Sequence, residues 1–211
     1  MKKIVIIAST GGSVLSKVLH LPSIQNSIFM VVSDRQCTAL DVAQKFGVDT
    51  KILSAKSGKE FSIKLVDFFK DKDVSYFLSF YTRIFTEELL NTYEDKVLNF
   101  HPSILPACPG TDGFGDTVRS GAKFIGSTLH FVDLGIDTGM PLIQSSFPYQ
   151  PSLTLKQNRH RVFIQQCKIF IQFIEWDNQN RIKDCSVLES KYELSEFVPN
   201  LDSNLAIEFD C

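Results

Sequence analysis

The sequence predicts an α/β fold, an open and mostly parallel sheet with helices on both of its faces. Three observations indicate it. Short apolar runs alternate with longer stretches of helical spacing along the 211 residues. The first run, Ile4–Ala8, is apolar at every position, as in a strand buried on both faces. A glycine-containing turn over residues 9–13 then leads into a helix, which is the order of a Rossmann-like crossover.

The remaining elements follow from the spacing of apolar residues. Predicted helices are stretches of helical periodicity, and they cover residues 13–21, 38–46, 59–70, 86–92 and 162–176. Predicted strands are short apolar or alternating runs at residues 28–32, 50–53, 74–80, 97–100, 128–132 and 142–144. Pro22 is expected to close the first helix, and Gly47 is placed to cap the second. The tail from Arg181 to Cys211 is expected to form one or two edge strands and a loop.

Composition narrows the class of protein. With 44% hydrophobic and 22% charged residues, the chain has the composition of an ordinary globular protein. Its net charge of −2 does not give the positive electrostatic field that nucleic-acid binding needs. No apolar run reaches membrane length, and the one after Lys3 breaks too early for a signal peptide. Five scattered cysteines without a CxxC pair favour reduced thiols in a cytoplasmic protein, and the dispersed histidines favour no metal. A monomer or a homodimer is expected.

Two segments carry residues suited to catalysis. Asn99 and His101 alternate at the end of a predicted strand, so they face the same way where open α/β sheets bind ligands. Asp137 lies between glycines in a predicted loop and is free to approach a histidine. The set suits acyl transfer: Asn99 donates to an oxyanion, His101 supports its charge or relays a proton, and Asp137 accepts a proton from an amine. Alternatively, His101 is structural and Asp137 only a turn former.

The turn after the first strand is a candidate for anion binding. Gly11, Gly12 and Ser13 offer backbone N–H groups and a hydroxyl at a helix start, which suits a phosphate. The turn is neither GxGxxG nor a phosphate-binding loop with its lysine, so the alternative is a tight turn that only feeds the helix. The roles of Cys108 and His130 stay open.

Three stretches resemble the formyltransferases that use 10-formyltetrahydrofolate: "NFHPSILPACPG", "GSTLHFVDLGIDTG" and the following "PLIQ". The resemblance implies the formyltransferase fold, catalysis by Asn99, His101 and Asp137, and 10-formyltetrahydrofolate as donor without a metal. It further implies that the donor lies against Thr82, Arg83 and Ile84 of the "TRIF" stretch, and against Asp137. It covers residues 1–185, which are expected to form the catalytic domain, with residues 186–211 as a C-terminal extension.

The resemblance also bears on the acceptor, a primary amine. The chain has the length of the family's purine-biosynthesis members, which formylate glycinamide ribonucleotide, and lacks the further domain of those that act on tRNA. The acceptor phosphate would then be held by Gly11, Gly12 and Ser13. Two positions depart from that pattern: Val14 replaces an asparagine, and residues 162–164 lack a glutamate. A nucleotide-linked 4-amino sugar is the alternative acceptor, because "LSFYTRIF" resembles enzymes that formylate such sugars. A folate-binding module without turnover is the alternative of another class.

Overall fold

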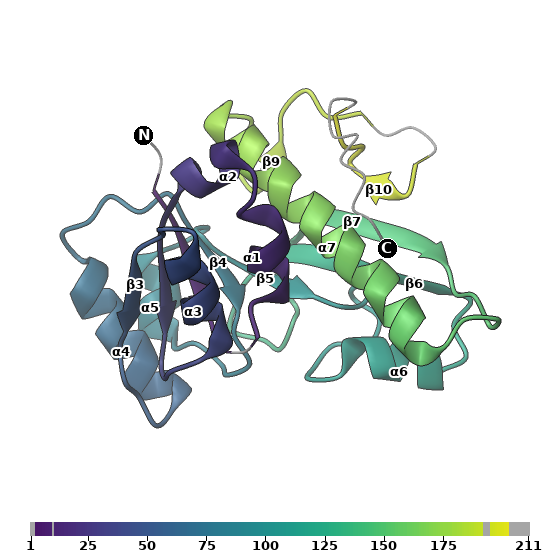
Figure 1. Ribbon diagram of the computed structural model, residues 1–211, viewed down its shortest axis with the longest axis horizontal. Helices are drawn as coiled ribbons and strands as arrows, with labels where there is room; N and C mark the ends of the chain where they lie inside the picture. The colour runs from purple at the N-terminus through teal and green to yellow at the C-terminus, as the bar shows by residue number, and fades with distance from the viewer. Residues whose placement is uncertain (1–2, 10, 192–194, 203–211) are drawn as a thin grey trace. The chain divides into compact units, whose positions relative to one another are not determined.

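The computed structural model describes residues 3–9, 11–191 and 195–202 (Figure 1). These divide into two compact units. The first contains Met1–Asn99 and Phe131–Ile136, and the second contains Phe100–His130 and Asp137–Cys211.

The first unit has the predicted parallel architecture. Its strands are β1 (Ile4–Ala8), β2 (Ile28–Ser33), β3 (Thr50–Ile52), β4 (Tyr76–Phe80) and the first part of β5 (Val97–His101). They pair in parallel in the order β5-β4-β1-β2-β3. All five residues of β1 are buried, as the uninterrupted apolar run predicts. The central strand is therefore covered on both faces.

Five helices accompany these strands: α1 (Ser13–Val18), α2 (Pro22–Ser27), α3 (Thr38–Lys45), α4 (Gly58–Phe69) and α5 (Glu87–Thr92). The apolar faces of α4 and α5 pack on Val5 and Ile7 of β1 in one core cluster. Side chains alternate along a strand, so Ile4 and Ile6, which are also fully buried, face the other side of the sheet.

The first predicted helix is shorter than expected. It ends at Val18, and Pro22 begins α2 instead of only closing α1. A proline is well suited to the first position of a helix, because it has no N–H to leave unpaired and its φ is already helical. The other helices of this unit lie within one residue of their predicted bounds, and Gly47 has the positive φ of a C-cap glycine.

The second unit is antiparallel. β6 (Phe124–Phe131) pairs with β7 (Pro141–Pro148), and β10 (Phe197–Val198) pairs with the other edge of β7. α6 (Gly113–Arg119) was not predicted, and α7 (Leu155–Asn178) begins seven residues earlier than expected. A capping box between Thr154 and Gln157 starts α7 there, ahead of the apolar residues on which the prediction rested.

In the tail, β10 is an edge strand beside β7, as expected. β8 (Ile182–Lys183) and β9 (Ser186–Val187) pair with each other in a separate two-stranded sheet, which was not predicted. Residues 203–211, the last part of that predicted segment, lie outside the described residues. Over the described ranges, no helix combines the length and the apolar character needed to cross a bilayer.

Candidate active site

His101 ends β5, and both of its ring nitrogens face oxygen acceptors in the second unit. Nε2 lies 2.8 Å from the backbone carbonyl of Cys108, and Nδ1 lies 3.3 Å from Oδ2 of Asp137. A neutral imidazole donates at only one nitrogen, whereas the imidazolium donates at both. Because neither a carbonyl nor a carboxylate can donate, a neutral His101 donates to one of these two oxygens and a protonated His101 donates to both.

Asp137 faces His101 from a constrained loop. Its φ is 53°, in the left-handed region that aspartate tolerates better than most residues. Oδ2 also accepts a hydrogen bond from the Gly110 N–H at 2.8 Å, and Oδ1 lies 3.5 Å from Nε2 of His130. The side chain is 15% exposed, so one carboxylate is shared between two buried histidines and a backbone amide.

The surroundings of Asp137 keep it ionised. Burial by itself would raise the pKa of the carboxyl group. The hydrogen bonds from His130 and Gly110, with the charge of His101, outweigh burial and hold the pKa of Asp137 below its ordinary value. At neutral pH Asp137 is therefore a carboxylate, and it faces the rings of His101 and His130.

Polar side chains from the two later motifs form hydrogen bonds with the loop that follows His101. Ser127 of β6 donates to the His101 carbonyl at 2.9 Å, and Thr128 donates to the Ser103 carbonyl at 2.8 Å. Gln144 of β7 donates to the Leu105 carbonyl at 2.7 Å. These bonds explain why polar side chains occur at otherwise buried strand positions. They hold residues 101–105 against β6 and β7.

Gly126 has a steric role in the same motif. A Cβ at this position would lie 1.9 Å from the Ser145 carbonyl oxygen and 2.9 Å from Cγ1 of Ile104. Only glycine permits this approach of β6 to β7.

Two functional contacts were not predicted from the sequence. Cys108 contributes its backbone carbonyl, not its thiol: φ is 54°, and Ser103 Oγ also donates to that oxygen at 3.1 Å. His130 is buried on β6 and contributes its ring to Asp137. The alternation of β6 could have indicated an inward-facing His130, but alternation alone does not indicate its partner.

The other predicted site residues belong to the first unit. Asn99 lies on β5 two residues before His101 and pairs in register with Ser79 of β4. Thr82, Arg83 and Ile84 follow β4, with Arg83 bound to a buried aspartate and Ile84 67% exposed. Because β5 extends to His101, one strand carries both Asn99 and His101.

The predicted phosphate turn is held by packing. Gly12 has a φ of 66° and is the N-cap of α1, and a Cβ there would lie 2.6 Å from Cα of Ala39 in α3. A Cβ on Gly11 would meet nothing within 4 Å, and Ser13 is exposed. Gly12 is thus required by the fold, while Gly11 and Ser13 are open to a ligand.

Comparison with known proteins identifies the family. A profile described as formyl transferase matches residues 2–174. A phosphoribosylglycinamide formyltransferase from Bacillus subtilis is 31% identical over 170 residues, which cover 77% of this chain and 87% of the relative. A chloroplastic one from Vigna unguiculata is 29% identical over 93% of this chain and 69% of its own length.

Solved structures agree with the sequence comparisons. The crystal structure of phosphoribosylglycinamide formyltransferase from Streptococcus pneumoniae matches with a TM-score of 0.74 and 27% identity, over 83% of this chain and 98% of that one. A glycinamide ribonucleotide transformylase from Symbiobacterium toebii matches with a TM-score of 0.78 and 26% identity, over 89% and 93%. The profile match spans most of the 211 residues and includes both segments around His101 and Asp137, so the chain belongs to the formyl transferase family.

Proposed function

We propose that this chain transfers the formyl group of 10-formyltetrahydrofolate to the amine of phosphoribosylglycinamide, a step of purine biosynthesis. The observation that carries the proposal is the match to proteins of that name over most of their length. The pairing of His101 with Asp137 supports it, because an imidazole beside a carboxylate can take up positive charge, which suits a reaction that develops negative charge on oxygen. The free thiols of Cys37 and Cys108 suit a cytoplasmic setting.

The proposed chemistry needs no covalent enzyme intermediate. The acceptor amine attacks the formyl carbon, and the carbonyl oxygen becomes an oxyanion. Asn99 donates a hydrogen bond to that oxyanion, and His101 stabilises it as a cation. The new C–N bond remains when the C–N bond to the folate breaks. The proton shed by the amine passes to the departing folate nitrogen through Asp137, directly or by way of a water.

The described contacts refine the role of His101. Both ring nitrogens are engaged, one by Asp137 and one by the Cys108 carbonyl. A carbonyl partner is neutral and is therefore the weaker of the two. We infer that the Nε2–H exchanges the Cys108 carbonyl for the oxyanion as charge develops, while Asp137 keeps its hold on Nδ1. The hydrogen bond from His101 Nε2–H to the oxyanion in the transition state would then be stronger than its bond to the Cys108 carbonyl in the ground state.

We assign the two ligands to the remaining predicted residues. Gly11, Gly12 and Ser13 would contact the acceptor phosphate through backbone N–H groups. Thr82, Arg83 and Ile84 would border the donor, and residues 1–185 would form the catalytic domain. The proteins matched above are named for phosphoribosylglycinamide, which favours that acceptor over an amino sugar.

The test is an acceptor screen. Purified protein is mixed with 10-formyltetrahydrofolate and, separately, with phosphoribosylglycinamide, a nucleotide-linked 4-amino sugar, or no amine, and release of tetrahydrofolate is followed. The expected result is rapid release with phosphoribosylglycinamide alone. Release with the amino sugar alone would replace the proposed acceptor. Binding of 10-formyltetrahydrofolate without release of tetrahydrofolate in any mixture would indicate a folate-binding module without turnover.

A further inference from the structure

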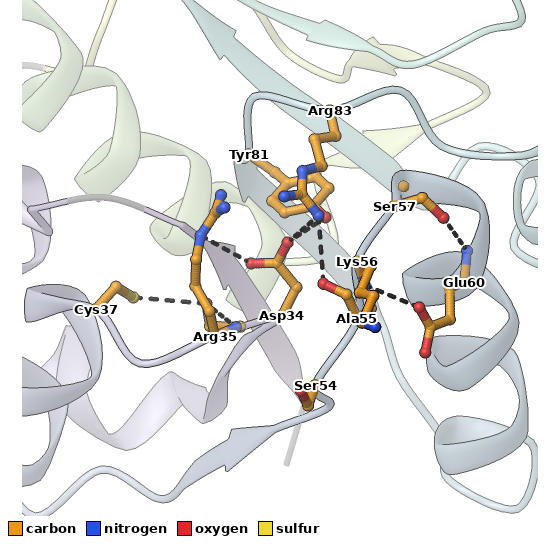
Figure 2. Close-up of polar contacts among 12 residues, drawn as sticks. Asp34, Arg35, Cys37, Ser54, Ala55, Lys56, Ser57, Glu60, Tyr81 and Arg83 are labelled. Atoms are coloured by element: carbon orange, nitrogen blue, oxygen red, sulfur yellow. Dashed lines mark hydrogen bonds and ion pairs between the residues drawn. The ribbon is translucent and has the colours of Figure 1, made fainter.

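A buried carboxylate outside the site of His101 organises the carboxyl edge of the first unit. Asp34 directly follows β2, and its side chain has no exposed surface. Its Oδ2 accepts a hydrogen bond from the Tyr81 hydroxyl at 2.9 Å and pairs with Arg83 at 2.7 Å (Figure 2). Its Oδ1 lies 3.2 Å from Nε of Arg35. Burial of Tyr81 and its bond to Asp34 raise the pKa of the phenol, so Tyr81 stays a neutral donor.

The chain that Asp34 holds is anchored at several further points. The Tyr81 ring lies 5.5 Å from that of Phe85 in a stacked arrangement, and 4.9 Å from that of Phe61 on α4. The Thr86 N–H donates to Ser62 Oγ at 3.1 Å. Both ends of residues 81–86 are therefore fixed to α4, and the middle is fixed through Arg83.

The middle of this segment also packs against the start of α4. A Cβ on Gly58 would lie 2.2 Å from the Ile84 carbonyl oxygen and 3.3 Å from Cβ of Arg83. Arg83 donates to the Ala55 carbonyl at 3.4 Å as well (Figure 2). Yet the Ile84 side chain points outward and is 67% exposed. A tightly held backbone that presents an exposed apolar side chain is the form of a binding platform, not of a mobile loop.

Stability alone is a weak reason for this arrangement. Well-packed apolar groups stabilise a core as well as a buried ion pair does, because desolvation offsets most of the attraction between the charges. Here one carboxylate faces two guanidinium groups, and Arg83 remains 31% exposed beyond its pair. The hydrogen bond from Tyr81 and the pairs with Arg83 and Arg35 offset the cost of burying Asp34, and they also fix the orientation of Tyr81 and Arg83.

We propose that Asp34 is a positioning residue for the formyl donor, fixing Arg83 and Tyr81 so that residues 82–84 keep the shape that binds the folate. The inference rests on the proposed function, in which those three residues border 10-formyltetrahydrofolate. Asp34 itself is buried and acts through Arg83 and Tyr81. The loss of Asp34 should therefore weaken donor binding more than it slows the formyl transfer of bound substrates.

The test compares three variants with the wild type. Asp34→Asn removes the charge, Tyr81→Phe removes only one hydrogen bond, and Asp67→Asn is the control. Asp67 is a carboxylate of the same unit that pairs with Lys70 at 3.1 Å on the exposed side of α4. The KM for 10-formyltetrahydrofolate, the KM for phosphoribosylglycinamide and kcat are measured, and tetrahydrofolate binding is titrated directly.

We expect Asp34→Asn to raise the donor KM and the tetrahydrofolate Kd by about tenfold, because small misplacements of a binding group are costly. The acceptor KM and kcat should stay within about twofold, as expected when binding is lost equally from ground and transition states. Tyr81→Phe should shift the same two quantities less, and Asp67→Asn should shift none. A folded Asp34→Asn protein with unchanged donor binding overturns the inference, as does an equal rise in both KM values.

The outcomes separate this inference from the proposed function. If Asp34→Asn fails to fold, Tyr81→Phe decides, and unchanged tetrahydrofolate binding by that variant overturns the role of Asp34. If the wild type binds tetrahydrofolate without formylating phosphoribosylglycinamide, the proposed acceptor falls, and the binding titration alone tests Asp34. If the wild type does not bind tetrahydrofolate, both proposals fall.

Discussion

Replacing Asp137 by asparagine is the most direct test of the proposed mechanism. The amide oxygen can still accept the Gly110 N–H, which now bonds Oδ2 at 2.8 Å. The amide NH₂ then takes the position of Oδ1, which lies 3.5 Å from Nε2 of His130, and the amide oxygen still faces Nδ1 of His101. That oxygen can accept a hydrogen bond from Nδ1, but it carries no negative charge. Asp137→Asn should therefore keep the fold and remove the negative charge beside His101, together with the basic group of the mechanism.

The expected loss follows from the geometry. Unit charges 3.3 Å apart, the distance from Nδ1 to Oδ2, attract by about 5 kcal/mol at an effective dielectric constant of about 20. Since about 1.4 kcal/mol corresponds to tenfold in rate, complete loss of this attraction in the transition state sets an upper bound of about 5,000-fold. The usual worth of a positioned acid–base group sets a lower bound of about 100-fold. Turnover should fall between these limits.

Three quantities are measured for the wild type and the variant: kcat at saturating donor and acceptor, the dependence of the rate on pH, and the ¹⁵N chemical shifts of the histidine rings. Asp133→Asn is the matched control, because Asp133 lies four residues earlier, is exposed and accepts the Gly135 N–H at 3.1 Å, which an asparagine also does. It should retain wild-type turnover. If Asp137→Asn leaves turnover, pH profile and histidine shifts unchanged, Asp137 is only a turn residue and the mechanism lacks its base.

Three further predictions concern the same reaction. Asn99→Ala should lower kcat by about 100-fold or more with smaller changes in either KM, and near-normal kcat would show that Asn99 is only structural. Gly11→Val should raise the acceptor KM alone because its side chain enters open space, whereas Gly12→Val should lower the melting temperature because it collides with Ala39. Because the pKa of Asp137 is lowered in the folded state, its carboxylate stabilises the fold fully above its ordinary pKa of 3.8. The unfolding free energy of the wild type should exceed that of Asp137→Asn at neutral pH, and this difference should shrink as the pH falls through the lowered pKa. A difference that grows in acid would contradict the prediction.

The sheet of the first unit was predictable because its signal is local. An unbroken apolar run such as Ile4–Ala8 fits a strand covered on both faces, and Gly47 marks a helix end by a conformation that few other residues adopt. The start of α7 was missed because residues 155–161 are largely polar, and capping, not burial, starts the helix there. Apolar periodicity detects buried faces and overlooks helices that begin outside the core.

The site was predictable as a set of residue types but not as a set of contacts. His101 and Asp137 were named from their motifs, and they do contact each other. The carbonyl of Cys108 was missed because any residue has one, and its direction depends on a backbone angle that the sequence does not specify. His130 was left open because its role depends on where Asp137 lies.

The positions of Val14 and Val162, which depart from the family pattern, limit which groups of this chain can recognise the acceptor. Val14 is buried in the first unit, and Val162 packs in the second with Phe114, Ile125 and Phe147. Both valines are buried apolar side chains, so neither offers a polar group to an acceptor. The phosphate binding that we propose for the turn would then depend on backbone N–H groups, and the turn itself is held by the packing of Gly12 on Ala39. Backbone donors recognise the phosphate and not the rest of the acceptor, so specificity for the glycyl amine must come from side chains elsewhere in the site.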